Sequence, residues 1–442
     1  MCFHCSFTNL YRNWGQCPRP QRMLRHFFIW HIGKFISVRP FRLFKKKVII
    51  RVFEREEAMR TVVYLEDRYN DEHIVFTKTM KPNHIVYLAT ATGLHAGYYE
   101  DFADYILTDY PKVNIEVKYI EKLNMVDLKV WMGDLAYLDG LHLASTNGLL
   151  AHVASRAAES LGIPCYYTDL EKDQILCLEG SGIQIVKENI EGIDITEIID
   201  IAGGDIIRKT SMFNEDPLIR RATDFIAENQ TRWKRLKRLL GLKEVFLHDE
   251  LDRAVVEAVL RRLDKSDYLL FKWMKTYLKD IGYLKTKRSK DDNLVLRFKS
   301  PEHKQFLFIS GSWLESLTYK TLQLVEGITD IESGVSFAWD FDDETIKNEI
   351  DVLATYKSRL YCFSCKDSAS YDVNALNELS VYAQRLGGQN VTKVLVVTDL
   401  PRKEGVLERA REMDVEVLIY EGNPVAFRRQ LERLFSKNMK GI

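Results

Sequence analysis

The chain has 442 residues, 46% of them hydrophobic and 29% charged, and its 63 lysines and arginines balance its 63 aspartates and glutamates. This length suits two or three domains, each with its own core, and the balanced charge excludes a strongly basic nucleic-acid-binding protein. A local groove for nucleic acid needs no global charge. Seven unevenly scattered cysteines argue against a disulfide framework and predict a cytoplasmic protein.

Residues 1–58 differ from the rest. They are rich in arginine and lysine, and their apolar run Phe27–Ile32 is too short to span a bilayer, so no membrane role is predicted. The segment also holds half of a zinc-knuckle pattern without a second half: Cys2, His4, Cys5 and Cys17. The favoured interpretation is a mis-assigned start, with Met59 as the true first residue, and a membrane or targeting role of the segment is the alternative.

From Met59 the pattern alternates between short apolar runs and longer runs with helical spacing. The predicted strands are Thr61–Leu65, His84–Ala89, Val113–Tyr119, Leu141–Ala144 and Cys165–Thr168, and the predicted helices are Asp71–Met80, Tyr98–Leu107 and Leu149–Leu161. This order predicts a doubly wound, Rossmann-like α/β domain over residues 59–205, with ligands at the carboxyl ends of its strands. Gly203 and Gly204 mark its end.

The turn Ser145–Gly148 precedes a helix whose N-terminal amides can hold a phosphate, and its small residues let a ligand approach the backbone. Taken alone, the turn is better explained as a simple helix cap by Ser145 or Thr146. His95 and His142 are expected to be ordinary polar residues rather than acid–base catalysts.

Residues 206–290 are predicted to form a helical connector, with helices at Leu251–Leu263 and Tyr268–Leu278. Its densest basic run, Arg232–Arg238, has two interpretations. The run can contact nucleic-acid phosphates, or it can be a solvated helix face. The second is favoured, with a buried stripe of Trp233, Leu236, Leu239 and Leu240. Short strands at Asn293–Phe298 and Gln305–Ile309 are expected to follow.

A hairpin within residues 291–442 carries the most informative polar residues. Two apolar strands, Ile350–Ala354 and Leu360–Phe363, flank a polar loop. If the loop closes symmetrically, Asp351 lies opposite Ser364 and Glu349 opposite Lys366. The other face is then apolar, formed by Ile350, Val352, Phe363 and Cys365. Cys362 and Cys365 form a CxxC, but residues three apart on a strand face opposite sides, so no metal pair is expected.

Charged groups crowded on a half-buried sheet face are costly unless they pair or hold a metal. Carboxylates suit Mg²⁺ or Mn²⁺, which can acidify a water and stabilise a pentacovalent phosphate, and Lys366 can orient or deprotonate that water. A helix from Gly311, with an apolar stripe, leaves Glu315 free to reach the same site. The stripe is Leu314, Leu317, Leu324 and Val325, with Thr321 on it. The alternative is a surface acid at Glu315 and a weak cross-strand ion pair between Asp351 and Lys366.

Three segments together resemble the PD-(D/E)xK nuclease domain of the CRISPR-associated ancillary nucleases that carry a CARF sensor domain. They are Gly311-Ser-Trp-Leu-Glu315, Asn348-Glu-Ile-Asp-Val352 and Ser364-Cys-Lys366, and the likeness runs on through Glu378–Gly388 and Lys393–Asp399. The resemblance implies a restriction-endonuclease-like α/β domain with a mixed sheet over residues 291–442. Its implied catalytic residues are Glu315, Asp351, Ser364 and Lys366, and its implied metal ligands are Glu315, Asp351 and Glu349. The family usually has an acid two residues before the lysine, and this position is Ser364 here. Glu349 or Glu378 would then supply the missing carboxylate.

The remaining elements expected there are helices at Val373–Leu386, Glu404–Glu412 and Val425–Phe435 and strands at Val394–Thr398 and Val415–Tyr420. The first of these helices is predicted to stop at Gly387-Gly388, since glycine commonly ends a helix.

The first domain resembles CARF domains in strand order, and Ser145–Gly148 falls where they contact cyclic oligoadenylate. The ligand-binding residues implied by this looser resemblance are Arg68, Asn70, Thr90, Thr92, Ser145, Thr146, Asn147 and Gly148. Glu66 and Asp67 beside them would repel phosphate. The family further implies a homodimer with the ligand on its two-fold axis, cyclic tetra-adenylate as activator, and cleavage of DNA, with RNA as a second substrate, in type III CRISPR defence.

Two other functions remain open. The chain can be a cyclic-oligoadenylate-binding sensor whose nuclease domain lost catalysis with the acid at Ser364, or a ring nuclease that degrades its own ligand. No P-loop, dinucleotide fingerprint or HExxH motif occurs, so ATP-driven and zinc-protease functions are excluded.

Overall fold

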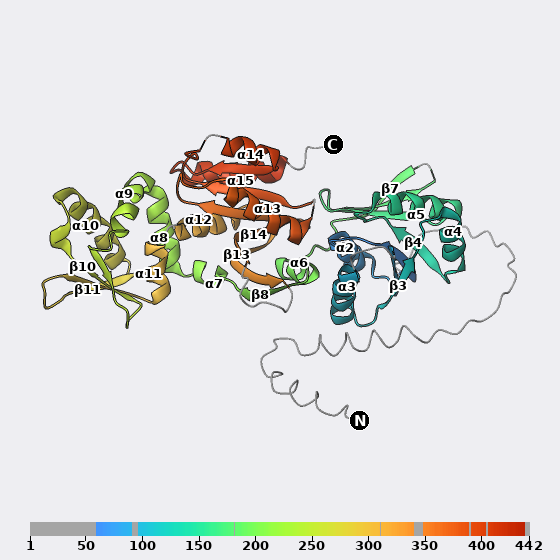
Figure 1. The fold of residues 1–442 in the computed structure, drawn as a ribbon, viewed down its shortest axis with the longest axis horizontal. Helices are drawn as coiled ribbons and strands as arrows, with labels where there is room; N and C mark the ends of the chain where they lie inside the picture. Colours follow the sequence, from blue (N-terminus) through green and yellow to red (C-terminus); the bar gives the residue numbers. More distant parts are fainter. Residues whose placement is uncertain are drawn as a thin grey trace, which may run out of the picture. The chain divides into compact units, whose positions relative to one another are not determined.

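The computed structural model describes residues 59–90, 96–180, 182–309, 311–339, 348–388, 390–403 and 405–437. The interpretations of residues 1–58, Thr92 and His95 lie outside these ranges. The described residues form three sheets, which Figure 1 shows with their helices. No helix in this part of the chain is long and apolar enough to cross a membrane.

The first sheet has seven strands in the order β3-β2-β1-β4-β5-β6-β7, and the first five are parallel. Its strands are β1 (Thr61–Leu65), β2 (His84–Thr90), β3 (Asn114–Ile120), β4 (Leu138–His142), β5 (Cys165–Asp169), β6 (Gln174–Glu179) and β7 (Gly182–Glu188). Its helices are α2 (Asp71–Met80), α3 (Ala96–Asp109), α4 (Met125–Asp134) and α5 (Gly148–Ser160), and α6 (Ile195–Ile201) follows. The predicted doubly wound domain is confirmed.

Alternation along the strands covers both faces of this sheet. Val62 and Tyr64 of β1 pack in the same core cluster as residues of α2 and α3, whereas Val63 and Leu65 pack with α4 and α5. The sequence did not predict α4 or the hairpin β6–β7. Every described residue of β7 is exposed, so this edge strand shows no alternation of buried and exposed positions.

The second sheet is antiparallel, in the order β11-β12-β10-β9. Its strands are β9 (Phe246–His248), β10 (Val255–Ala258), β11 (Leu284–Arg288) and β12 (Leu294–Phe298). The helices around it are α7 (Ser211–Asn214), α8 (Pro217–Glu228), α9 (Gln230–Leu240), α10 (Lys265–Asp280) and α11 (Pro301–Phe308), with a 3-10 turn at Leu260–Arg262. The sequence predicted a helical connector, and this prediction is wrong in part, because the connector also contains strands.

Two local predictions in this region were wrong. The predicted helix 251–263 contains β10, because the β-branched pair Val255 and Val256 joins the ladder to β12. The predicted strand 305–309 falls mostly in helix α11, which Ser300 caps by accepting from the His303 N–H, with Pro301 in the first turn.

The third sheet is mixed, in the order β17-β16-β15-β14-β13-β8, with antiparallel pairs from β8 to β15 and parallel pairs from β15 to β17. Its strands are β8 (Gly204–Arg208), β13 (Ile328–Trp339), β14 (Asn348–Tyr356), β15 (Arg359–Lys366), β16 (Thr392–Val397) and β17 (Val415–Ile419). Its helices are α12 (Ser312–Leu322), α13 (Val373–Gly387), α14 (Val406–Glu412) and α15 (Pro424–Lys437). The predicted mixed α/β domain is confirmed, with β8 as an edge strand from an earlier part of the chain.

Helices cover both faces of this sheet. Phe363 and Cys365 pack in one core cluster with α12 and α15, and Cys362 packs in the other with α13 and α14. The two cysteines therefore face opposite sides, as predicted. The apolar stripe of α12 is shorter than expected, because the helix ends at Leu322 and Leu324 is 54% exposed.

Candidate active site

The β14–β15 hairpin closes symmetrically, as the sequence predicted. Its ladder runs from Val352 opposite Phe363 to Tyr356 opposite Arg359, so only Lys357 and Ser358 form the turn. Both strands are longer than expected. Continuing this register places Asp351 opposite Ser364.

The ladders on both sides of β14 are interrupted at Asp351. On β13, Ser333 pairs with Val352 and Val335 with Ile350, whereas Gly334 between them has a φ of 50°. The ladders skip Asp351 on both sides. Ile350 therefore packs in the cluster that contains α13, and not with Val352. The prediction that these two residues share one apolar face is wrong, because the break interrupts strand alternation.

The carboxylate of Asp351 is held by the facing strand. Its Oδ2 accepts from the Cys365 N–H at 2.6 Å and from the Ser364 hydroxyl at 3.2 Å, and the Lys366 Nζ lies 3.9 Å away. The Cys365 amide thus binds a side-chain oxygen at this point of the hairpin. Asp351, Ser364 and Lys366 lie together, and the cross-strand ion pair of the structural alternative is also present.

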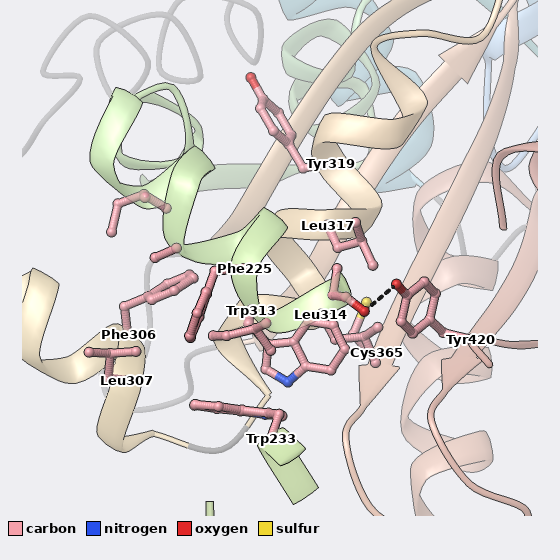
Figure 2. Close-up of a cluster of buried hydrophobic side chains, with 14 of the residues drawn as sticks. Phe225, Trp233, Phe306, Leu307, Trp313, Leu314, Leu317, Tyr319, Cys365 and Tyr420 are labelled. Carbon is pink, nitrogen blue, oxygen red and sulfur yellow. Dashed lines mark hydrogen bonds between the residues drawn. The ribbon is translucent and has the colours of Figure 1, made fainter. Parts of the chain in front are cut away.

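Helix α12 brings Glu315 to this hairpin. Trp313, Leu314 and Leu317 are buried in the cluster that contains Cys365 and Tyr420, which fixes the rotation of the helix (Figure 2). Glu315, in the first turn, is left off this buried face.

Burial raises the pKa of Glu315 to about 8, with further upward contributions from the charges of Asp351 and Glu349 and an opposing one from Lys366. Burial also raises the pKa of Asp351, opposed by Lys366 and by its hydrogen bonds. Glu315 is therefore a crowded, partly buried acid and not the surface acid of the alternative.

The two remaining acids differ in position. Glu349 is exposed, and its Oε2 accepts from the Ser336 hydroxyl at 3.4 Å. Glu378 is exposed on α13 and interacts with Tyr382, and it is not among the charges that shift the pKa of Glu315. The structure therefore brings Glu349 to the candidate site and leaves Glu378 outside it.

Sequence analysis missed Asp367, which directly follows Lys366. Its side chain is fully buried, and Oδ2 accepts from the indole N–H groups of Trp313 at 2.7 Å and Trp233 at 3.3 Å. The Thr398 hydroxyl donates to Oδ1 at 2.9 Å, and the Lys237 Nζ lies 3.0 Å from Oδ2. Asp367 thus anchors the end of β15. Its partners come from distant segments, so no local pattern indicates its role.

The basic run on α9 serves this anchoring. Trp233, Leu236, Leu239 and Leu240 are all buried, which confirms the favoured interpretation of a buried stripe. Lys237 binds Asp367, Lys234 binds Asp399 at 2.5 Å, and Arg235 binds Asp267 at 2.5 Å. Aspartates therefore neutralise most of the charge that the sequence made conspicuous.

At the carboxyl edge of the first sheet, three loops meet as predicted. The Glu66 Oε2 accepts from the Thr90 N–H at 2.8 Å and from the Thr90 hydroxyl at 2.7 Å. The Ser145 hydroxyl donates to the Glu66 carbonyl oxygen at 2.7 Å. Glu66 was expected to repel phosphate, but it instead connects the three loops by these hydrogen bonds.

The implied ligand residues at this edge have different surroundings. Asn147 caps α5 by accepting from the Leu150 N–H at 3.1 Å, so the cap falls one or two residues later than Ser145 or Thr146. Thr146 and Gly148 are exposed.

Two further implied ligand residues, Arg68 and Asn70, belong to the loop that follows β1. Asn70 is 1% exposed and accepts from the Tyr87 hydroxyl at 3.1 Å, which gives it a structural task, whereas Arg68 is exposed and lies over the Tyr69 ring.

Comparison with known proteins identifies one part of the chain. No curated protein matches it, but residues 302–434 match the family model described as Card1-like, endonuclease domain. This part of the chain is therefore similar to Card1-like endonuclease domains. It contains the hairpin, α12 and the anchoring Asp367, and it confirms the predicted nuclease domain.

Two solved structures share the fold over most of the chain. Protein VC1899 from Vibrio cholerae is 17% identical, with a TM-score of 0.69 over 87% of this chain and 100% of that one. Can2 from Sulfobacillus thermosulfidooxidans, in complex with cyclic tetra-adenylate, is 14% identical, with a TM-score of 0.61 over 85% of this chain and 97% of that one. Both structures therefore share most of the fold described above.

Proposed function

We propose that this chain is a metal-dependent endonuclease switched on by a cyclic oligoadenylate, with cyclic tetra-adenylate as activator. The observation that carries the proposal is the crowded acid site of Asp351, Glu315 and Lys366 within a Card1-like endonuclease domain. The chain also shares its fold with Can2, whose structure holds cyclic tetra-adenylate. DNA is the proposed substrate, with RNA as a second. The protein acts as a cytoplasmic homodimer that holds the symmetric ligand on its axis, in type III CRISPR defence.

The electrostatics of the site favour a divalent cation. Glu315, Glu349 and Asp351 bring three carboxylates against the single ammonium of Lys366, and burial and repulsion raise the pKa of Glu315 to about 8. No group of three or more His, Cys, Asp or Glu side chains within the described ranges is arranged to hold a metal. Glu315 and Asp351 would therefore hold Mg²⁺ or Mn²⁺ together with waters and phosphate oxygens, as Mg²⁺ commonly binds. Such an ion acidifies a water and neutralises phosphate charge.

The chain's own residues then have distinct tasks. The Cys365 amide and the Ser364 hydroxyl fix the Asp351 carboxylate, and the Lys366 ammonium can orient a water or a phosphate oxygen. Glu315 is largely protonated at neutral pH and must release its proton to bind a cation. Because its pKa is about 8, cation affinity is expected to rise with pH up to that value. Asp367 keeps the strand that carries Lys366 in place.

A second candidate function rests on Ser364. Its hydroxyl donates to Asp351 where the related nucleases have an acid, so the site has one carboxylate fewer on β15. A protein that binds the cyclic ligand without cleaving nucleic acid would be the consequence.

The deciding experiment incubates the purified protein with supercoiled plasmid and Mn²⁺, with cyclic tetra-adenylate, with cyclic hexa-adenylate, or without either. We expect nicking or linearisation only with cyclic tetra-adenylate. Cleavage without any ligand would remove the sensor role. Ligand binding without cleavage would replace the nuclease proposal by the binding-protein function.

A further inference from the structure

The lysines and arginines of the chain are unevenly distributed. The segment from Lys265 to Lys299, which contains α10, β11 and β12, has ten lysines and arginines against four aspartates and no glutamate. The whole chain has equal numbers of both charges. This segment is therefore a local positive region in a neutral protein.

On α10 the lysines occupy one side. Its buried residues Phe271, Met274 and Leu278 face the core cluster. At about 100° per residue, the four lysines of the helix lie within an arc of about 80° that avoids this buried side. They are Lys265, Lys272, Lys275 and Lys279, of which only Lys275 is partly buried. They extend over about 21 Å of helix, at a rise of about 1.5 Å per residue.

The hairpin that follows α10 adds to this positive surface. Lys285 and Lys287 alternate with the buried Leu284 on β11, so both point away from the core, and both are exposed. Lys290, at the tip of the hairpin, is also exposed. α10 packs directly against β11, so the helix and the hairpin belong to one structural unit.

Little in the protein neutralises these groups. Seven lysines of the segment form no ion pair or hydrogen bond through their side chains with any described residue: Lys265, Lys272, Lys275, Lys279, Lys285, Lys287 and Lys290. On α9, in contrast, Lys234, Arg235 and Lys237 are each bound to an aspartate. Uncompensated like charges repel one another, and a polyanion would relieve that repulsion.

We propose that α10 and the β11–β12 hairpin form a second nucleic-acid-binding surface, which holds duplex DNA by its phosphates through lysines that are not part of the cleavage site. Duplex DNA presents a dense line of phosphates, which suits lysines spread along a helix and an adjoining hairpin. These contacts carry no base readout, so they add affinity without sequence preference. The surface goes beyond the nuclease function proposed above, and its binding can be measured without cleavage.

The test uses the full-length protein in EDTA, a fluorescent DNA duplex of about two helical turns, and anisotropy titrations at several salt concentrations. The variant is Lys272→Gln, Lys275→Gln and Lys279→Gln combined. Each lost phosphate contact lowers the slope of log affinity against log salt by about 0.9, so we expect a decrease of up to about 3 and binding at least about tenfold weaker at low salt.

The matched control changes Lys112, Lys129 and Lys172 to glutamine, three exposed lysines of the first domain that also lack ion pairs with described residues. Its binding and salt slope should equal those of the wild type. If the α10 variant behaves like this control, the proposal is overturned. The double variant Lys285→Gln, Lys287→Gln tests the hairpin separately, so a folding failure of one variant does not decide the result. Unchanged DNA binding by this double variant would remove the hairpin from the surface.

Two further arms fix the partner. Duplex RNA that binds more tightly than DNA, or phosphatidylserine vesicles that compete with DNA for the same lysines, would overturn the assignment to DNA. The Asp351→Ala variant should bind the duplex like the wild type. If Asp351→Ala loses cleavage but still binds the duplex, the nuclease site has failed and the lysine surface has not. If the lysine variant binds the duplex weakly but keeps its cleavage chemistry, the surface has failed and the nuclease site has not.

Discussion

The two candidate sites treat their polar groups in opposite ways. At the carboxyl edge of the first sheet, polar groups have partners within the protein: Glu66 binds Thr90, Ser145 binds the Glu66 backbone, and Asn147 caps a helix. In the endonuclease domain, Glu315 and Asp351 crowd together, and the pKa of Glu315 rises to about 8. The polar groups of the first site are satisfied by one another, whereas the acids of the second site remain crowded.

This difference indicates what each site can do. An edge whose side chains hold one another offers a fixed shape, with exposed residues such as Thr146 and the helix amides left for a ligand. Excess negative charge in a partly buried site is costly, and a divalent cation bound there would relieve that cost and offset the charge of a phosphate. Substitutions should therefore affect chemistry at one site and ligand affinity at the other.

The largest effect is expected at the acid site. Asp351→Ala or Lys366→Ala should lower the plasmid cleavage rate by at least about 10³-fold, because each removes a charged group at the reacting phosphate. Thermal unfolding followed by circular dichroism should show that both variants remain folded. The control is Glu326→Ala, which removes an exposed acid of the same domain. Full cleavage by Asp351→Ala would refute the site assignment.

At the carboxyl edge of the first sheet, a change of charge should act on the affinity for the ligand. Asn147→Asp keeps a good N-cap for α5, so stability should hold. The added negative charge near a bound phosphate should raise the cyclic tetra-adenylate concentration needed for activation by about tenfold. Thr146→Val, at an exposed position, should act in the same direction.

The matched control is Asn124→Asp, because Asn124 caps α4 by accepting from the Val126 N–H at 2.9 Å, in the loop that follows the edge strand β3. It should leave activation unchanged. Equal activation of the Asn147→Asp variant and the wild type would remove this turn from the pocket.

A smaller effect is expected from restoring the acid at Ser364. Ser364→Glu adds a carboxylate beside Asp351, so it should preserve or raise cleavage and lower the Mn²⁺ concentration for half-maximal rate by about tenfold. Ser364→Gln supplies the same bulk without the charge and should not lower it. If glutamate abolishes cleavage while glutamine does not, the serine hydroxyl is itself part of the working site.

The sequence predicted what depends on local pattern. The hairpin register followed from two apolar strands and a short polar loop, and the doubly wound sheet from alternating elements. It could not predict the break at Asp351, which depends on Gly334 of another strand, or the role of Asp367, whose partners lie on α9, on α12 and after β16. It predicted the buried stripe of α9 but not the partners of its basic residues, since the neutralising aspartates are distant in the chain.

A buried histidine pair also lies at the carboxyl edge of the first sheet, and its groups, unlike those of the acid site, satisfy one another. The His73 Nε2 lies 2.7 Å from the Leu65 carbonyl oxygen and must donate to it, so Nδ1 accepts from the His142 Nδ1–H at 2.7 Å. The His142 Nε2 then accepts from the Thr168 hydroxyl at 2.8 Å. Both rings are neutral in this arrangement, and burial lowers the pKa of His73 to about 4 and that of His142 in the same direction.

Because these folded pKa values lie below the unfolded value of about 6.5, the unfolded chain binds more protons at acidic pH. Stability should therefore be complete above about pH 6.5 and fall toward pH 4, by up to about 1.4 kcal/mol per pH unit for each histidine. Urea unfolding at pH 7 and pH 5 measures this loss. The double variant His73→Gln, His142→Gln should be less stable at pH 7 but lose less on acidification, whereas His152→Gln, at an exposed position, should match the wild type. If the wild type and the double variant lose the same free energy of unfolding between pH 7 and pH 5, this pair does not set the acid sensitivity of the first domain.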